Sequence, residues 1–206
     1  MKAYISEMIG TFGLVLVGAG SIALNMPHFW ISVCFGVIVT LMILSFGKIS
    51  GAHINPAVSI AFYFYRNEKK ALWYIPFQLI GGLLAGLFLL YFLPENPTYG
   101  ETLPSGSLVQ TFLIEVFITF LLMLSILIII QTDHLPKIAI VVGFVVFLAA
   151  FFAGPFTGAS MNPARSFGPA IVSNQLEVLW LYFLAPIIGA VLAVPIFNFL
   201  RKIRTK

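Results

Sequence analysis

Six runs of apolar residues constrain the fold of this chain more than any other feature of its sequence. Each run approaches the roughly 20 residues that an α-helix needs to cross the hydrocarbon core of a membrane. Hydrophobic residues make up 60% of the chain and charged residues only 9%, far below the roughly 25% of a soluble domain. We therefore predict an all-α membrane protein with six transmembrane helices. The runs lie near residues 4–24, 31–49, 71–93, 107–131, 137–153 and 178–200.

The basic residues predict how the chain is oriented. Ten of the eleven Lys and Arg residues lie near the chain ends or in alternate connecting segments, which the positive-inside rule places in the cytoplasm together with both termini. The net charge of +4 therefore reflects membrane topology and not nucleic-acid binding. Arg165 is the exception, because it lies on the other side. The ten are Lys2, Lys48, Arg66, Lys69, Lys70, Lys137, Arg201, Lys202, Arg204 and Lys206.

Two segments do not fit a plain count of six helices. Residues 50–66 and 154–174 each contain Gly, Pro and Asn followed by about ten residues compatible with a helix. Ten to twelve helical residues rise about 15–18 Å, near half of the hydrocarbon core. We expect two re-entrant half-helices. Non-helical backbone at this depth is tolerated only where protein buries it or water reaches it, so the pair indicates an internal aqueous cavity.

An internal repeat supports this architecture. Glu7 recurs as Glu115, 108 residues on, and Asn55 recurs as Asn162, 107 residues on. Three spans per copy mean that the second copy enters the membrane from the opposite side, and inverted repeats place the functional site near the bilayer midplane. We predict a single domain over residues 1–206, with repeats at about 1–93 and 107–206 joined by an external loop, 94–106.

Each half-helix begins with the same three residues, Asn55-Pro56-Ala57 and Asn162-Pro163-Ala164. Asn is a preferred helix cap and Pro suits the first turn, so one copy alone would indicate an ordinary capped helix. Two copies in matched positions favour a functional role. Two helix N-termini that point at the centre present positive partial charge there. The arrangement repels cations and protons, while each Asn amide donates to the oxygen of a passing neutral molecule.

These motifs, the six-span repeat and the longer string from Asn162 to Ala170 resemble the aquaporin, or major intrinsic protein, family over nearly the whole chain. The resemblance implies six helices and two half-helices in a homotetramer with one pore per subunit, embedded in the lipid bilayer. It also implies a passive channel for water and small neutral solutes, without a cofactor.

The resemblance further implies a selectivity filter on the external side of the Asn pair. Arg165 occupies the family's filter-arginine position, and an arginine that faced lipid there would cost several kcal/mol. The first half has Val58 at the matching place, so only one end carries a filter. Distances from the motifs carry the other filter positions over to Phe35, Ala150 and Ala159.

Ala150 stands where strict water channels of the family usually carry histidine. Replacing imidazole by methyl widens a pore, so we expect water to pass together with glycerol, urea, or metalloid hydroxides such as arsenous and boric acid, as in nodulin-like members. Other markers conflict: Ser166 and Ala170 replace the Asp and Lys of glycerol channels, and Tyr182-Phe183 resembles the water-channel branch. A strictly water-selective channel is the alternative.

Glu7 and Glu115 are carboxylates inside spans, which are functional candidates by default. The resemblance implies that both accept hydrogen bonds from the non-helical loops, and His53 is expected to brace its loop similarly. His134 is a candidate pH gate, although a solvated loop histidine is the simpler interpretation.

Other functional classes lack their residues. Three histidines and a single apolar-run cysteine, Cys34, supply neither an enzyme's catalytic set nor a metal site. A secondary transporter also uses inverted repeats and broken helices, but here its coupling charges are limited to Glu7, Glu115 and Arg165. The compact loops and the lack of an evident targeting segment favour a bacterial inner membrane.

Overall fold

The computed structural model describes residues 1–96 and 98–204, and within these residues every regular element is a helix. The elements are α1 (Lys2–Ala23), α2 (His28–Ser50), α3 (Pro56–Arg66), α4 (Lys69–Leu72), α5 (Tyr74–Phe92), α6 (Leu108–Ile129), the 3-10 turn η1 (Ile130–Thr132), α7 (Leu135–Thr157), α8 (Pro163–Ser173) and α9 (Leu179–Arg204).

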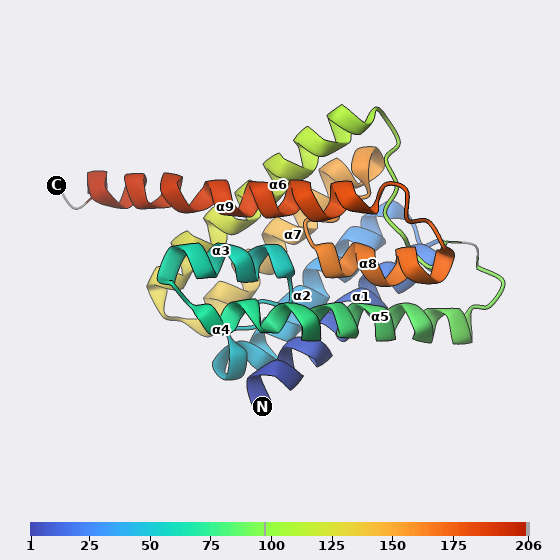
Figure 1. Cartoon of the computed structure of the whole chain (residues 1–206), viewed down its shortest axis with the longest axis horizontal. Helices are drawn as coiled ribbons and strands as arrows, with labels where there is room; N and C mark the ends of the chain where they lie inside the picture. The colour runs from blue at the N-terminus through green and yellow to red at the C-terminus, as the bar shows by residue number, and fades with distance from the viewer. Residues whose placement is uncertain (97, 205–206) are drawn as a thin grey trace.

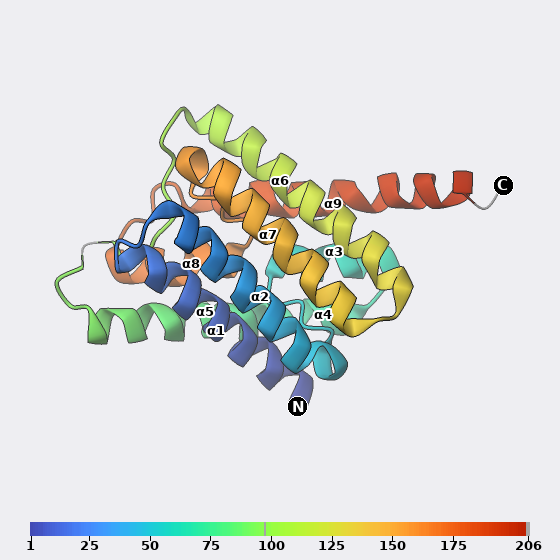
Figure 2. The same ribbon diagram turned by 180° about the vertical axis from the view of Figure 1, so that it is seen from behind.

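The long helices confirm the six predicted spans. Among the described residues, six helical stretches are long and apolar enough to cross a membrane. They contain α1, α2, α5, α6, α7 and α9, with α4 leading into α5 and η1 ending α6. The short helices α3 and α8 lie between α9 and α5, one after the other along the long axis (Figure 1). From behind, α1, α2, α7 and α6 cross this pair obliquely (Figure 2).

Matched helix pairs form the two sides of the bundle. Helix α1 packs on α5 and, in the second half, α6 packs on α9. Glycine allows the same close approach in both pairs, because a Cβ on Gly81 would strike the Met8 carbonyl and a Cβ on Gly189 the Val116 carbonyl. Helices α2 and α7 pack on each other and join the two sides.

The half-helices α3 and α8 have 11 residues each, or about 16 Å of rise. Each has Asn at its N-cap and Pro in its first turn, as predicted. Each ends at an asparagine in the left-handed conformation, Asn67 or Asn174, which this residue type tolerates. The helices before them, α2 and α7, end at the left-handed glycines Gly51 and Gly158. The turn residues therefore set both half-helices in the same way.

Two predicted boundaries were wrong. Helix α7 does not stop at residue 153 but continues through Pro155 to Thr157, so the segment 154–174 begins as the last turn of a spanning helix. Helix α9 extends past residue 200 to Arg204. The non-helical backbone is correspondingly short, at residues 51–55 and 158–162.

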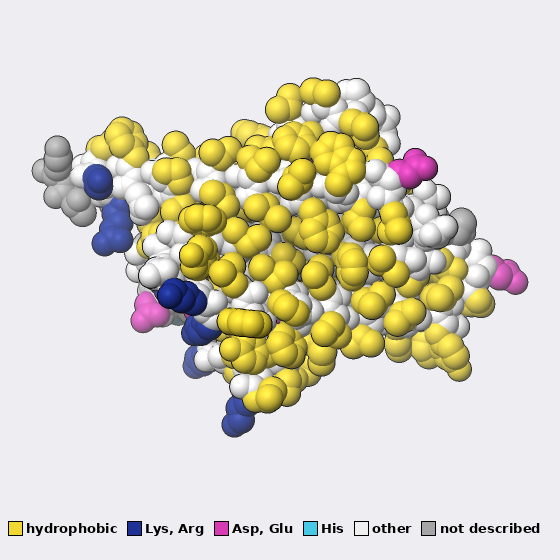
Figure 3. Space-filling view, in the orientation of Figure 1, with side chains coloured by type: hydrophobic (Ala, Val, Ile, Leu, Met, Phe, Trp, Pro, Cys, Tyr) yellow, Lys and Arg dark blue, Asp and Glu magenta, His cyan; other side chains and the backbone are white. Residues whose placement is uncertain are grey.

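The outer surface separates apolar sides from charged ends. In Figure 3 hydrophobic side chains cover the flank, and Lys and Arg gather toward the end where the C-terminus lies. We call the end that carries Lys48, Arg66 and Met1 the basic end. The opposite end, which carries residues 98–106 and the last turn of α8, is the loop end.

Candidate functional site

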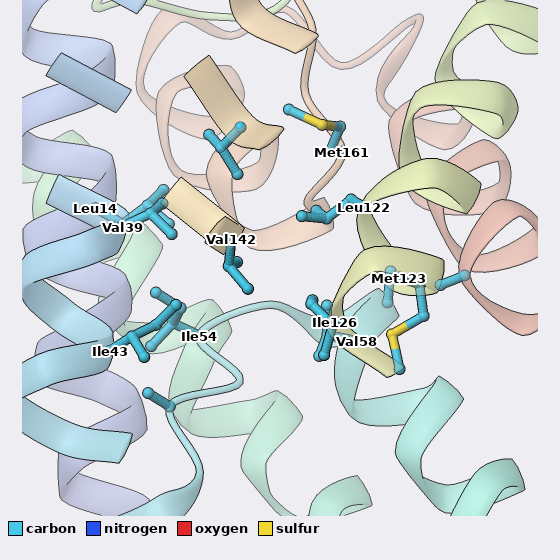
Figure 4. Close-up of a cluster of buried hydrophobic side chains, with 14 of the residues drawn as sticks. Leu14, Val39, Ile43, Ile54, Val58, Leu122, Met123, Ile126, Val142 and Met161 are labelled. Atoms are coloured by element: carbon cyan, nitrogen blue, oxygen red, sulfur yellow. The ribbon is translucent and has the colours of Figure 1, made fainter. Parts of the chain in front are cut away.

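A narrow central cavity of about 50 Å³ runs between the long helices and the two non-helical segments. Its walls are mainly apolar; Leu14 and Val39 lie on one side and Leu122 and Ile126 on the other (Figure 4). A water molecule needs roughly 10–15 Å³ of such space, so the cavity holds a short file of waters. The lining residues are Leu14, Phe35, Val39, His53, Asn55, Val58, Leu122, Ile126, Val142, Val146, Ala150, Ala159, Ser160, Met161, Asn162 and Arg165.

Asn55 and Asn162 face this cavity from the N-termini of α3 and α8. The side-chain oxygen of each caps its own helix, accepting from Ala57 N at 2.9 Å and from Ala164 N at 3.0 Å. The side-chain nitrogen of each crosses to the other half. One amide hydrogen of each Asn is thus committed, and the second is left for a molecule in the cavity.

The crossing bonds tie the two halves together. Asn55 Nδ2 donates to the Met161 carbonyl at 2.8 Å, and Asn162 Nδ2 donates to the Ile54 carbonyl at 2.9 Å. Ile54 and Met161 are left-handed, with φ of 42° and 52°, a conformation that costs a β-branched or long side chain about 1–2 kcal/mol. Both strained residues are therefore held from the opposite half.

Glu7 supports the first non-helical segment and is fully buried. Its Oε1 accepts from Ser50 Oγ at 2.6 Å and from His53 N at 2.9 Å. Its Oε2 accepts from Ile54 N at 2.6 Å and from Gln78 Nε2 at 2.8 Å. One carboxylate thus satisfies two backbone amides that have no helical partner.

Glu115 does the same for the second segment. Its Oε1 accepts from Thr157 Oγ1 at 2.8 Å and Ser160 N at 2.9 Å, and its Oε2 accepts from Met161 N at 2.9 Å. Gln78 has no counterpart, because Pro186 stands 108 residues after it. The two carboxylates therefore hold equivalent backbone with different neighbours.

His53 lies where the central cavity meets a wider opening at the basic end. Its Nδ1 is 3.1 Å from Ser59 Oγ, and its ring stacks on Phe62 with centroids 4.5 Å apart. The opening, which we call the vestibule, has a volume of about 380 Å³ and is lined by charged residues that include Lys48, Arg66 and Asp133. Since His53 lines both spaces, it marks the inner end of the narrow path.

The four proposed filter residues line the central cavity together. The Arg165 guanidinium carbon lies 5.1 Å from the centre of the Phe35 ring. Arg165 Nη1 donates to the Gly100 carbonyl at 2.7 Å, whereas its Nε and Nη2 have no hydrogen-bond partner within the described chain. Ala150 and Ala159 contribute only methyl groups. The site therefore offers buried N–H donors opposite an aromatic ring and two small side chains.

Two residues of the connecting loop take part in the site, and sequence reasoning missed them. Gly100 holds Arg165, and Thr102 Oγ1 donates to Ser166 Oγ at 2.6 Å. Ser166 Oγ is in turn 2.6 Å from Ser160 Oγ. The loop has no copy in the first half, and a backbone carbonyl leaves no mark in the sequence. By contrast, Tyr74 and Tyr182, whose hydroxyls donate to the Ser50 and Thr157 carbonyls, could have been found from their 108-residue spacing.

His134 does not reach the path. It is exposed and caps α7, where its Nδ1 accepts from Lys137 N at 3.2 Å. Among the described residues no group of three or more His, Cys, Asp or Glu side chains is close enough to hold a metal ion.

Comparisons with known proteins agree on one family. Residues 1–197 match the family model described as major intrinsic protein. A probable aquaporin NIP-type of Nicotiana alata is 40% identical over 98% of this chain and 78% of its own length, and nodulin-26 of Glycine max is 35% identical over the same shares. The solved aquaglyceroporin of Plasmodium falciparum superposes with a TM-score of 0.88 at 26% identity, covering 96% of this chain and 95% of that one.

Proposed function

Because the chain belongs to the major intrinsic protein family, and is thus a membrane channel for water and small solutes and not an enzyme, we propose that it also conducts small uncharged solutes larger than water. The solutes are glycerol, urea, or metalloid hydroxides such as arsenous and boric acid. Protons and ions are excluded. The pore is formed by one chain, as a single domain of two inverted repeats, about 1–93 and 107–206.

One observation carries the proposal on solutes: Ala150 and Ala159 line the same cavity as the two unpartnered donors of Arg165. A hydroxylated solute is held by its oxygens on the guanidinium, while its carbon or metalloid centre lies against the methyl groups and the Phe35 ring. The name of the Plasmodium falciparum relative, an aquaglyceroporin, and the NIP-type relatives support the same solute class.

Exclusion of ions follows from fixed charge. Arg165 is 1% exposed, and two helix N-termini, each with about half a positive charge, meet at Asn55 and Asn162. A cation 4 Å from such a charge meets a barrier of about 4 kcal/mol even at an effective dielectric constant of 20. Glu7 and Glu115 do not offset this barrier as a proton path, because their oxygens accept bonds from backbone and neighbouring side chains.

The cavity volume of about 50 Å³ favours a second candidate, a strictly water-selective channel. Stopped-flow light scattering on reconstituted vesicles separates the two, with water, glycerol, urea, arsenous acid and boric acid tested side by side. The proposal requires solute flux well above that of empty vesicles for at least one of the larger molecules. Rapid water flow without any of them would establish the second candidate. A flux linear in the gradient, without saturation or dependence on an ion gradient, identifies a channel and not a carrier.

We also propose the topology and assembly. The gathering of Lys and Arg at the basic end (Figure 3) supports cytoplasmic termini, and the compact loops support a bacterial inner membrane. Exposed apolar side chains on α2 and α7, such as Leu41 and Phe144, support a homotetramer. In a Cys34→Ser background, a membrane-impermeant maleimide should label a cysteine at Glu95 but not at Lys137 in intact cells. Mass photometry should give the mass of four chains.

A further inference from the structure

Helix α7 carries a carbonyl that its own helix leaves without the usual partner. In an α-helix the carbonyl of one residue accepts from the amide four residues later. Four residues after Phe151 stands Pro155, which has no amide hydrogen. The Phe151 carbonyl lies one residue from Ala150, a wall of the proposed filter.

His28, the first residue of α2, supplies the missing donor. Its Nε2 lies 2.9 Å from the Phe151 carbonyl oxygen. Because a carbonyl only accepts, Nε2 carries the hydrogen in this contact. The imidazole also stacks on the Phe151 ring, with centroids 5.7 Å apart and an angle of 22° between the planes. His28 therefore contacts both the backbone and the side chain of Phe151.

Gly154 leaves the space that this contact needs. A Cβ on Gly154 would lie 3.0 Å from His28 Cε1, closer than such contacts normally are. The imidazole thus fits against the helix only because this position has no side chain.

The same two helices touch more deeply in the bundle. A Cβ on Gly36 of α2 would lie 2.9 Å from the Gly143 carbonyl of α7, so the backbones meet there at close range. Phe35 is next to this crossing, and Ala150 lies seven residues, about 10 Å, beyond Gly143 toward the loop end. Two helices fixed at one crossing can still separate at their ends. His28 joins them at the end where the filter lies.

We propose that His28 is a positioning residue that holds the loop ends of α2 and α7 together and thereby sets the distance between Phe35 and Ala150. The inference rests on the proposed role of these two residues in the filter. It concerns the loop end alone, because the residue 107 positions after His28 is Leu135, which cannot donate. The width of the filter thus depends on a contact outside the cavity.

The test compares water and glycerol permeability of reconstituted full-length channels. His28→Phe keeps an aromatic ring over Phe151 but removes the donor, and we expect the glycerol-to-water ratio to change by about fivefold, the factor equivalent to one net hydrogen bond. His28→Gln keeps a donor and should bring the ratio back to within about twofold of the wild type. Trp30→Phe, an exposed substitution two residues away, is the matched control and should leave the ratio unchanged.

A double-mutant cycle tests the origin of the effect. Pro155→Ala restores an amide hydrogen within reach of the Phe151 carbonyl, so His28→Phe should add less than about twofold in that background. Additive effects, an unchanged ratio in His28→Phe, or an equal change in His28→Gln would overturn the inference. If His28→Phe does not reconstitute, Gly154→Ala replaces it, because the added methyl group displaces the imidazole. Water flow in every variant keeps this outcome separate from that of the proposed function: a wild type that excludes glycerol refutes the solute proposal, and the ratio is then measured with urea or as water permeability alone.

Discussion

Glu7 and Glu115 hold matching backbone, yet their surroundings differ in a consistent direction. Around Glu7, Gln78 Nε2 donates to both the carboxylate and Ser59 Oγ, so this half closes on its own residues. Around Glu115, Pro186 replaces that amide, and Ser166 instead bonds Thr102 of the connecting loop. The basic-end half is thus self-contained, whereas the loop-end half is completed by a segment outside the repeat.

The difference shows where selectivity can vary without loss of the fold. Val58 and Arg165 occupy matching positions in the two halves, and only Arg165 is held by a loop carbonyl. Changes in residues 98–106 can move the guanidinium while the Glu7 network stays as it is. Substitutions in either half test this division.

The largest effect is expected from removing either carboxylate. Glu7→Gln loses the charge that four donors share, and Glu115→Gln the charge that three share. Since bonds to charged groups contribute about 1.5–3 kcal/mol each, both variants should lose about 3 kcal/mol or more, with Glu7→Gln the more severe. Thermal unfolding in detergent and water permeability measure the losses. The exposed Glu177→Gln is the control; equal behaviour of all three variants would contradict the assignment.

Arg165→Val makes the loop-end half resemble the basic-end half. Loss of the buried charge should raise proton flux about tenfold or more, since each 1.4 kcal/mol removed from a barrier is tenfold in rate. Glycerol flux should rise as well. Vesicles loaded with a pH-sensitive dye record the proton current, and Val58→Ala serves as the comparison. A proton flux equal to the wild type would mean that the half-helix N-termini alone form the barrier.

Ala150→His narrows the filter opposite Arg165. The larger side chain should lower glycerol permeability about tenfold, within the range for small size differences in a tight site, and should leave water permeability within about threefold. Stopped-flow measurements on the same vesicles give both numbers. A parallel fall in both permeabilities would indicate general blockage and not selectivity.

Thr102→Val tests the connecting loop with an isosteric change. Without the hydroxyl, Ser166 loses its bond to the loop, at a net cost of about 1 kcal/mol. We expect a two- to threefold change in the glycerol-to-water ratio and no change in the stability of the Glu7 network. Ser59→Ala is the corresponding change in the other half, and it should affect stability but not the ratio.

The smallest effect is a dependence on pH at the loop end. Burial raises the pKa of Glu101 above its usual 4.5, and the hydroxyl of Ser173, which donates to it, offsets this in part. Because the packed loop binds the proton more tightly than an open loop, protonation favours packing. This contribution is complete below pH 4.5 and is lost as the pH rises through the raised pKa. Glycerol flux should thus increase less than about twofold over that rise, and Glu101→Gln should abolish the dependence. A dependence that persists in Glu101→Gln would assign it to another group.

Hydropathy, capping preferences and the internal repeat predicted most of the architecture. Apolar run lengths indicated the six spans, and Asn-Pro pairs indicated the starts of α3 and α8. The course of α7 past residue 153 could not be predicted, because Pro155 ordinarily interrupts a helix and its compensation by His28 comes from 123 residues away in sequence. The packing of residues 98–106 was equally hidden, since their polar composition is typical of a solvated loop, and Gly100 acts through its backbone.

The exchange of amide bonds between Asn55 and Asn162 has a consequence for synthesis of the channel. Asn55 finds its acceptor, the Met161 carbonyl, only 106 residues later. At about 5–20 residues per second, a ribosome needs roughly 5–20 seconds to supply it. During that interval the first half lies in the bilayer with its strained loop only partly secured. The conduction path is therefore completed last, and a nascent chain halted before Met161 lacks the contacts that would form a pore.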